Sequence, residues 1–342
     1  MDHRKLSLLL LAAACSTGDA PPPQRPSAAG DSTLATSSSP GSTGISTASG
    51  AVAATTTAAG GPANLQGRVP VLEYHVIGGE KNTLYTRTVA SYRSDLDSAY
   101  KLGYRPITMA QMLDKDFRDV PAGMAPVVVV FDDASDSQFR YLEKNGTLVV
   151  DPTSGLGIWE DFARTHPGWK PRAVFCMLNG GAAGHNFFGD NPKFNGQKKE
   201  WRFPKVKYLA DQGHELCAHT LWHAKLSQYP DNVVQEQIAR NAMGIDSVVP
   251  GYRIRTIALP YGLWPKNRPL AWQGSWTDPK TGKAHAYKFD AVLEVAGGPA
   301  RGPYDPQFNP KSVNRIQAVG NDVVRTLTTL RQTNTRLVVG AK

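Results

Sequence analysis

Cysteine is scarce in this chain of 342 residues, and so are long apolar runs and blocks of like charge. Three cysteines are too few for a scaffold built on disulfides in a chain of this size. The run of Leu and Ala at residues 6–14 is too short to span a bilayer as a stable helix. The formal charge is +9, but no lysine/arginine block accompanies it, so we do not expect a nucleic-acid partner. Apolar residues make up 41% of the chain, which is enough for a substantial core.

The N-terminus has the order of an export signal, which we assign to residues 1–15. Charged residues 2–5 precede the Leu/Ala run, which ends in A-A-A-C at Ala12–Cys15. Small residues before a cysteine resemble a bacterial lipobox, in which the cysteine is acylated, although Ala12 stands where leucine is usual. The alternative is an ordinary secretory signal that happens to contain Cys15. Both alternatives predict an exported protein, and the lipobox also predicts a membrane anchor through lipid on Cys15.

Two further cysteines, Cys176 and Cys217, lie in apolar runs. Small buried thiols are the default interpretation of such positions. One disulfide between them stays open as an alternative, because an exported protein meets an oxidising compartment.

Residues 16–66 are rich in Ser, Thr, Ala, Gly and Pro and contain neither an aromatic residue nor a lysine. Such a segment cannot bury enough apolar surface to offset chain entropy, so we expect a disordered tether. A single folded domain, residues 67–342, is expected to follow it.

Apolar runs typical of buried strands alternate with helical patterns throughout the expected domain. The strand patterns fall at residues 69–77, 126–133, 173–178, 214–218, 256–259 and 291–295. The helical patterns fall at residues 89–103, 109–117, 158–165, 205–212, 233–245 and 323–330. This alternation predicts parallel βα units, and seven or eight of them would close a barrel with functional residues at the C-terminal ends of its strands.

Two adjacent carboxylates, Asp132 and Asp133, follow the apolar run P-V-V-V-V-F that begins at Pro126. Two acids at the mouth of a buried strand repel each other and are costly to desolvate, and a cation or a proton between them relieves that cost. The pair alone also fits a simpler interpretation, in which one acid caps the next helix and the other is solvated.

Two histidines, His219 and His223, are four residues apart, which lets both imidazoles reach one metal ion. With one carboxylate they form a three-ligand set that leaves coordination positions open for water and substrate. Taken alone, they are also compatible with two surface or capping histidines.

Three short segments together resemble the first three motifs of the polysaccharide deacetylases, the NodB-homology domain of carbohydrate esterase family 4. They are F-D-D-A-S at Phe131–Ser135, H-T-L-W-H at His219–His223 and A-L-P-Y-G at Ala258–Gly262. The similarity runs from about residue 68 to about residue 320. It implies a distorted (β/α)7 barrel, which agrees with the alternation of strands and helices.

The resemblance also implies roles for individual residues. Asp133, His219 and His223 would bind a divalent metal, most often Zn²⁺. Asp132 would act as the general base toward the attacking water, and the backbone N–H of Tyr261 would help to hold the oxyanion.

The chain departs from the family pattern at three places. Ala134 stands where glycine is usual, and Ala258 stands where the family carries an arginine that supports the base. Arg253 and Arg255 are near enough in sequence to substitute for that arginine, whereas Arg315 is expected at the surface, with the barrel mouth as the alternative.

The third departure concerns the general acid, because no Leu-x-His is found near the C-terminus, where the family places this residue. His75, at the end of the first strand, is the best alternative acid or substrate contact. Two other interpretations stay open: His75 is hydrogen-bonded in the barrel core, or Asp132 both takes and returns the proton.

The motifs predict a metal-dependent hydrolase that removes N-acetyl groups from an extracellular or cell-wall amino-sugar polysaccharide. The alternatives are an O-acetyl esterase, a deacylase of small molecules, or a non-catalytic carbohydrate-binding lipoprotein on the same scaffold. Asp132 favours the enzyme, because binding alone would not require a second carboxylate. We expect the protein to act as a monomer.

Overall fold

A computed structural model describes residues 62–182 and 184–341 of the chain. The predicted export signal, Cys15 and most of the predicted tether lie outside these residues. Asn64 pairs with Val338 and its side chain donates to the carbonyl oxygen of Arg336, so ordered structure begins a few residues before the expected boundary at residue 67. Within the described ranges, no helix has both the length and the apolar character needed to cross a membrane.

Seven parallel strands close into a ring in which each strand is hydrogen-bonded to the next. In ring order they are β2 (Val71–Tyr74), β16 (Val313–Gln317), β14 (Ala291–Gly297), β11 (Thr256–Ala258), β10 (Glu215–Ala218), β9 (Val174–Met177) and β6 (Ala125–Asp132). The ring closes where β6 pairs with β2. An eighth strand, β5 (Tyr104–Ile107), pairs with the first half of β6, whereas β9 pairs with its last residues. The predicted (β/α)7 barrel is therefore confirmed.

The helices fall close to the predicted positions: α1 (Val89–Lys101), α2 (Met109–Leu113), α3 (Gly155–Thr165), α4 (Arg202–Asp211), α5 (Asp231–Val248) and α6 (Asp322–Gln332). Thr108 and Gln111 form a reciprocal capping box that starts α2. This helix ends four residues earlier than predicted, and Lys115 beyond it adopts a left-handed φ of 57°.

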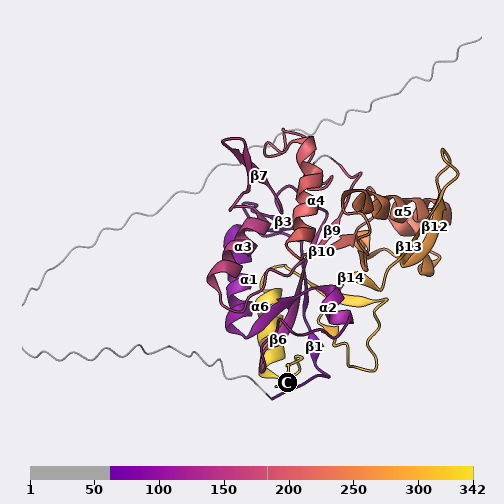
Figure 1. Cartoon of the computed structure of the whole chain (residues 1–342). Coiled ribbons are helices and arrows are strands. Elements are labelled where there is room, and N and C mark those ends of the chain that lie inside the picture. The colour runs from indigo at the N-terminus through magenta and orange to yellow at the C-terminus, as the bar shows by residue number, and fades with distance from the viewer. Residues whose placement is uncertain (1–61, 183, 342) are drawn as a thin grey trace, which may run out of the picture. The chain divides into compact units, whose positions relative to one another are not determined.

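Short strand pairs and 3-10 helices lie outside the barrel. Four antiparallel or parallel pairs lie outside the ring: β1 (Arg68–Val69) with β15 (Ala300–Arg301), β3 (Val76–Ile77) with β4 (Thr86–Arg87), β7 (Tyr141–Lys144) with β8 (Thr147–Val150), and β12 (Gln273–Thr277) with β13 (Ala284–Lys288). Short 3-10 helices are η1 (Lys199–Trp201), η2 (Leu226–Gln228), η3 (Pro260–Gly262) and η4 (Arg268–Ala271). The β12–β13 hairpin packs on α5 (Figure 1).

Alternate strand residues face opposite sides of the barrel wall, as a pleated strand requires. One set, which includes Phe131 and Phe175, packs beneath the surrounding helices. The other set, which includes Val130, Cys176 and Cys217, fills the barrel interior. Cys176 and Cys217 are paired neighbours on β9 and β10 and form a disulfide, which settles the alternative left open by the sequence.

Candidate active site

The C-terminal ends of the parallel strands carry the polar residues of the site. His75 follows β2, Asp133 follows β6 and His219 follows β10. Because the strands are parallel, these ends meet at one mouth of the barrel. There they border a cavity of about 400 Å³, here called the mouth cavity, which is lined by Glu73, His75, Tyr85, Asp132, Asp133, His219, His223, Leu259, Tyr261, Val295 and Gln317.

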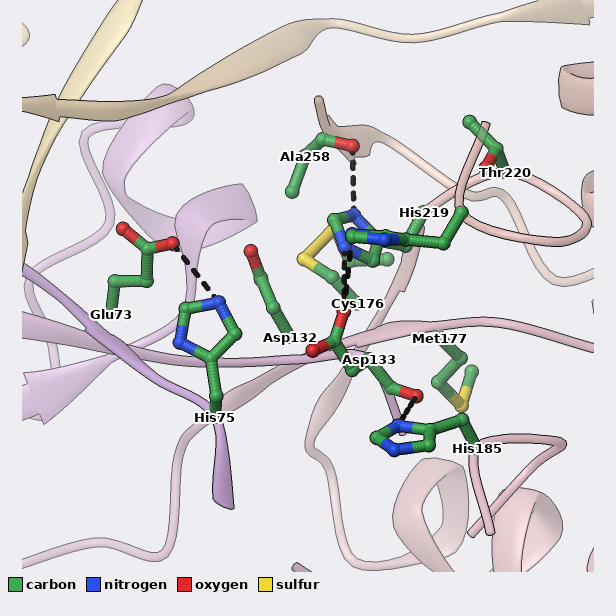
Figure 2. A network of polar contacts seen from close by, with 12 residues as sticks. Glu73, His75, Asp132, Asp133, Cys176, Met177, His185, His219, Thr220 and Ala258 are labelled. Carbon is green, nitrogen blue, oxygen red and sulfur yellow. Dashed lines mark hydrogen bonds and ion pairs between the residues drawn. A yellow bond between two sulfur atoms is a disulfide. The ribbon is translucent and has the colours of Figure 1, made fainter. Parts of the chain in front are cut away.

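Three potential metal ligands converge in this cavity. Nε2 of His219 lies 3.2 Å from Oδ1 of Asp133, and Nε2 of His223 lies 3.3 Å from the same oxygen. The structure therefore brings together the two imidazoles and the carboxylate that the sequence proposes as a set. Figure 2 shows the ring of His219 directed toward Asp133. Two nitrogens and one oxygen with the remaining directions open toward a cavity are a donor set that suits a catalytic Zn²⁺ ion.

The turn after β6 lets both aspartates reach the cavity. Asp133 and Ala134 have φ values of 78° and 49°, in the left-handed region that residues with a Cβ rarely adopt. The usual glycine at the place of Ala134 is thereby explained, because glycine enters this region without a steric penalty. Two contacts hold the turn: the amide of Phe188 donates to the Ala134 carbonyl at 2.9 Å, and Nδ1 of His185 lies 3.3 Å from the Asp133 carbonyl oxygen.

Hydrogen bonds orient His219 toward Asp133. Its Nδ1 lies 3.0 Å from the carbonyl oxygen of Ala258, so Nδ1 carries the proton there and Nε2 keeps a lone pair for a metal. Its backbone amide donates to Oδ1 of Asn241 on α5. Asn241 was not predicted as a site residue. The signal in the sequence is that this polar residue lies on the buried face of α5, where apolar residues are usual.

The loop between the two histidines also has an internal contact. Thr220 adopts a left-handed φ of 69°, and its hydroxyl accepts a hydrogen bond from the amide of Ala224 at 3.2 Å. This bond spans His223, whose φ is 65°. The turn therefore brings the His223 side chain back to the cavity that His219 reaches from the end of β10.

The electrostatics favour a bound cation. Burial disfavours the charged form of Asp133, but the close contact with His219 and the charges of the neighbouring histidines outweigh burial and hold the pKa of Asp133 well below its usual range. Burial, followed by the charge of His219, lowers the pKa of His223 to about 4. An ionised carboxylate and a neutral imidazole are the forms that coordinate a divalent metal.

Arg315 is the residue whose position was predicted wrongly. It is 1% exposed and lies in the barrel interior, where Nη1 approaches Oδ1 and Oδ2 of Asp132 at 2.9 and 2.8 Å. Arg253 and Arg255, the substitutes suggested by the sequence, both pair with Asp290 instead. The arginine partner of Asp132 thus comes from β16, and the surface position expected for Arg315 is incorrect.

His75 lines the mouth cavity beside a carboxylate that was not predicted. Its Nε2 lies 3.4 Å from Oε1 of Glu73 (Figure 2), and that oxygen lies 3.3 Å from Nη2 of Arg315. Gln138 fixes the neighbouring backbone, because its Nε2 donates to the carbonyl oxygens of both His75 and Asp132. His75 therefore borders the mouth cavity with its ring in contact with Glu73.

Tyr261 lies on η3 at the rim of the mouth cavity, with a left-handed φ of 58°. Its ring packs against His223 with centroids 4.3 Å apart, and 47% of the residue is exposed. A Cβ on the following Gly262 would meet the Val295 side chain at 2.6 Å, so glycine is required for this close approach. The segment is thus held close beside the histidines.

Fold and site together define a class: a parallel (β/α)7 barrel with a two-histidine, one-carboxylate cluster at the C-terminal ends of its strands. The family model described as polysaccharide deacetylase matches residues 171–272, which include His219, His223 and Tyr261. The resemblance that the motifs predict is confirmed. No curated protein is significantly similar to the chain in sequence.

Three solved structures, two of them described as deacetylases, share the fold. The Streptococcus pyogenes deacetylase PplD in complex with acetate has a TM-score of 0.53 at 15% identity, over 77% of this chain and 98% of that chain. IcaB from Ammonifex degensii has a TM-score of 0.51 at 17% identity, over 78% and 97%. A putative polysaccharide deacetylase from Bacillus anthracis has a TM-score of 0.51 at 15% identity, over 77% and 69%.

Proposed function

We propose that this protein is a metal-dependent hydrolase that removes N-acetyl groups from amino sugars of an extracellular or cell-wall polysaccharide. One observation carries the proposal: Asp133, His219 and His223 converge on one point, and Asp132 lines the same cavity. The match to the polysaccharide deacetylase family model supports the reaction type.

Asp133, His219 and His223 would hold the divalent ion, and their nitrogen and oxygen donors suit zinc. An ion bound there would lower the pKa of a water toward ~7 and polarise the acetyl carbonyl. Side chains and backbone groups of the chain would carry out the proton transfers and hold the oxyanion.

Asp132 is placed to accept the proton of the attacking water, and Arg315 fixes the orientation of its carboxylate through both oxygens. The backbone N–H of Tyr261 donates to the oxyanion as the carbonyl carbon becomes tetrahedral. His75 delivers a proton to the leaving nitrogen, which would otherwise depart as an unstable anion.

Acetate release from a panel of polymers tests this function. We expect release from chitin oligomers, peptidoglycan or a β-1,6-linked acetylglucosamine polymer, loss of release with a chelator, and recovery when zinc is returned. Release from acetylated xylan alone would identify an O-acetyl esterase. Binding to a polymer without any release would identify a non-catalytic carbohydrate-binding protein.

We also propose that the protein is exported and anchored to a membrane through lipid on Cys15. The support is the order of charged residues, Leu/Ala run and A-A-A-C in the sequence. Cys15→Ala should move the protein out of the detergent phase, whereas Ser16→Ala should leave it there. An unchanged detergent-phase fraction in Cys15→Ala would contradict the anchor and leave ordinary secretion.

A further inference from the structure

Glu73 is a buried carboxylate without a hydrogen bond. Its side chain is 1% exposed and lines the mouth cavity, yet neither Oε1 nor Oε2 has a hydrogen-bond partner among the described residues. A buried carboxylate whose oxygens accept no hydrogen bond destabilises the fold. An apolar residue would stabilise the barrel more at this position, so the fold alone does not account for Glu73.

The nearest polar atoms are Nε2 of His75 at 3.4 Å and Nη2 of Arg315 at 3.3 Å. Nη1 of Arg315 contacts Asp132 and its Nε donates to the carbonyl oxygen of Glu294, whereas its Nη2 has no hydrogen-bond partner among the described residues. Glu73 therefore shares the arginine with Asp132 but does not form the close pair. One guanidinium serves two buried carboxylates.

A proton is the natural compensation for the second carboxylate. Burial raises the pKa of Glu73 to about 8, against the opposing charge of Arg315 and together with the charge of Asp132. Burial lowers the pKa of the adjacent His75. The other charged groups that act on Glu73 are His219, which lowers its pKa, and Asp133, which raises it. Glu73 and His75 together are therefore expected to retain one proton at neutral pH.

We propose that Glu73 is a positioning residue of the reaction: it shares one proton with His75 across the contact between Oε1 and Nε2 and so keeps that proton available for the leaving nitrogen. This inference rests on the proposed deacetylase function. As the C–N bond breaks, its electron pair stays on nitrogen. The O–H bond of Glu73 breaks as its proton moves to Nε2 of His75, and Nε2 donates the proton to the leaving nitrogen. A neutral imidazole and an ionised Glu73 are left, and the free Nη2 of Arg315 faces the new charge.

A comparison of two leaving groups tests this role. A chitin oligomer releases an amine, which requires a proton, whereas 4-nitrophenyl acetate releases a stabilised aryl oxide, which does not. Glu73→Gln should lower kcat for the chitin oligomer by about 10- to 100-fold, while hydrolysis of the aryl ester stays within about threefold of the wild type, because only general-acid assistance is lost. His75→Ala should show the same split, and the double variant should lose little more than either single variant.

The control is Glu215→Gln, because Glu215 is also buried in the barrel interior but lies outside the mouth cavity. Its carboxylate accepts hydrogen bonds from the hydroxyl of Thr256 and the amide of Ala110. This variant should keep the wild-type ratio of the two activities, whatever its stability. If Glu73→Gln does not fold, as judged by circular dichroism, the same ratio is measured for Glu73→Asp, which keeps a carboxyl group at a greater distance from Nε2.

Equal losses on both substrates would make Glu73 a structural residue and overturn the inference. An unchanged rate on the chitin oligomer would overturn it as well. Both results require an active wild type, so they leave the proposed function intact. A wild type that releases acetate from neither substrate would instead contradict the proposed function itself.

Discussion

Nη1 of Arg315 lies 2.9 Å from Oδ1 and 2.8 Å from Oδ2 of Asp132, although 183 residues separate the two in the sequence. Barrel closure makes this contact, because β16 pairs with β2 and β2 pairs with β6. The carboxylate that we propose as the base is thus oriented by an arginine from the C-terminal part of the sequence.

Arg315→Lys tests whether Asp132 needs the geometry of the guanidinium or only its positive charge. A lysine keeps the positive charge, but its single ammonium cannot reproduce the planar arrangement of the guanidinium. We expect acetate release to fall by about 100-fold, the effect of a misplaced reacting group, with the metal content unchanged. Arg253→Lys is the matched control, because Arg253 pairs with Asp290 and its side chain is 68% exposed. Equal activity of the two variants would contradict an orienting role for Arg315.

Asp132→Asn tests the proposed base. The amide cannot accept a proton from water, so acetate release should fall by about 10²- to 10⁴-fold. Zinc content, measured by elemental analysis, should stay at the wild-type level because Asp133, His219 and His223 are unchanged. Undiminished turnover would rule out Asp132 as the base.

His214→Phe should reduce the sensitivity of the fold to acid. His214 is 3% exposed, neither ring nitrogen has a hydrogen-bond partner among the described residues, and burial followed by the charge of Arg172 lowers its pKa to about 3. The ordinary pKa of a histidine is 6.5. Between this pH and about 3, His214 therefore binds a proton in the unfolded chain but stays neutral in the folded chain. The free energy of unfolding of the wild type should fall as the pH drops from 6.5 toward 3.

The variant lacks this contribution, so its advantage over the wild type should grow by up to ~1.4 kcal/mol per pH unit below 6.5. Urea unfolding at pH 8 and pH 5 measures the difference. A gap between the two proteins that is the same at both pH values would show that His214 does not titrate differently on folding.

The disulfide should contribute to stability through the unfolded chain. Cys176 and Cys217 are separated by 41 residues, and closing a loop of this length corresponds to about 4 kcal/mol. The double variant Cys176→Ala/Cys217→Ala should lose about this free energy of unfolding in urea. Peptide mapping without reductant checks the bond itself, and a pair of free thiols there would contradict it.

The sequence predicts much of the site because the motif residues are adjacent to strand ends. Asp133 follows a run of valines, and His219 follows the apolar strand β10. Parallel strands bring their C-terminal ends to one mouth, so the order of strands and helices is enough to predict that these side chains meet.

Arg315 and Glu73 were not predicted as site residues, because their positions follow from barrel closure and from the side of the strand that each one faces. Arg315 lies in V-N-R-I, a segment too polar to be recognised as a strand, and its environment is created by the neighbouring β2 and β14. A signal was nevertheless present. Val313 and Arg315 are two residues apart on one strand, as are Val71 and Glu73, so each polar residue faces the same side as its valine, which is the barrel interior.

Anomalous X-ray diffraction at the zinc absorption edge, from crystals grown with zinc, tests the central claim most directly. The account predicts one strong peak at coordination distance from Oδ1 of Asp133 and Nε2 of His219 and His223, absent from crystals of His219→Ala. A wild-type map with no peak at these three atoms would contradict it.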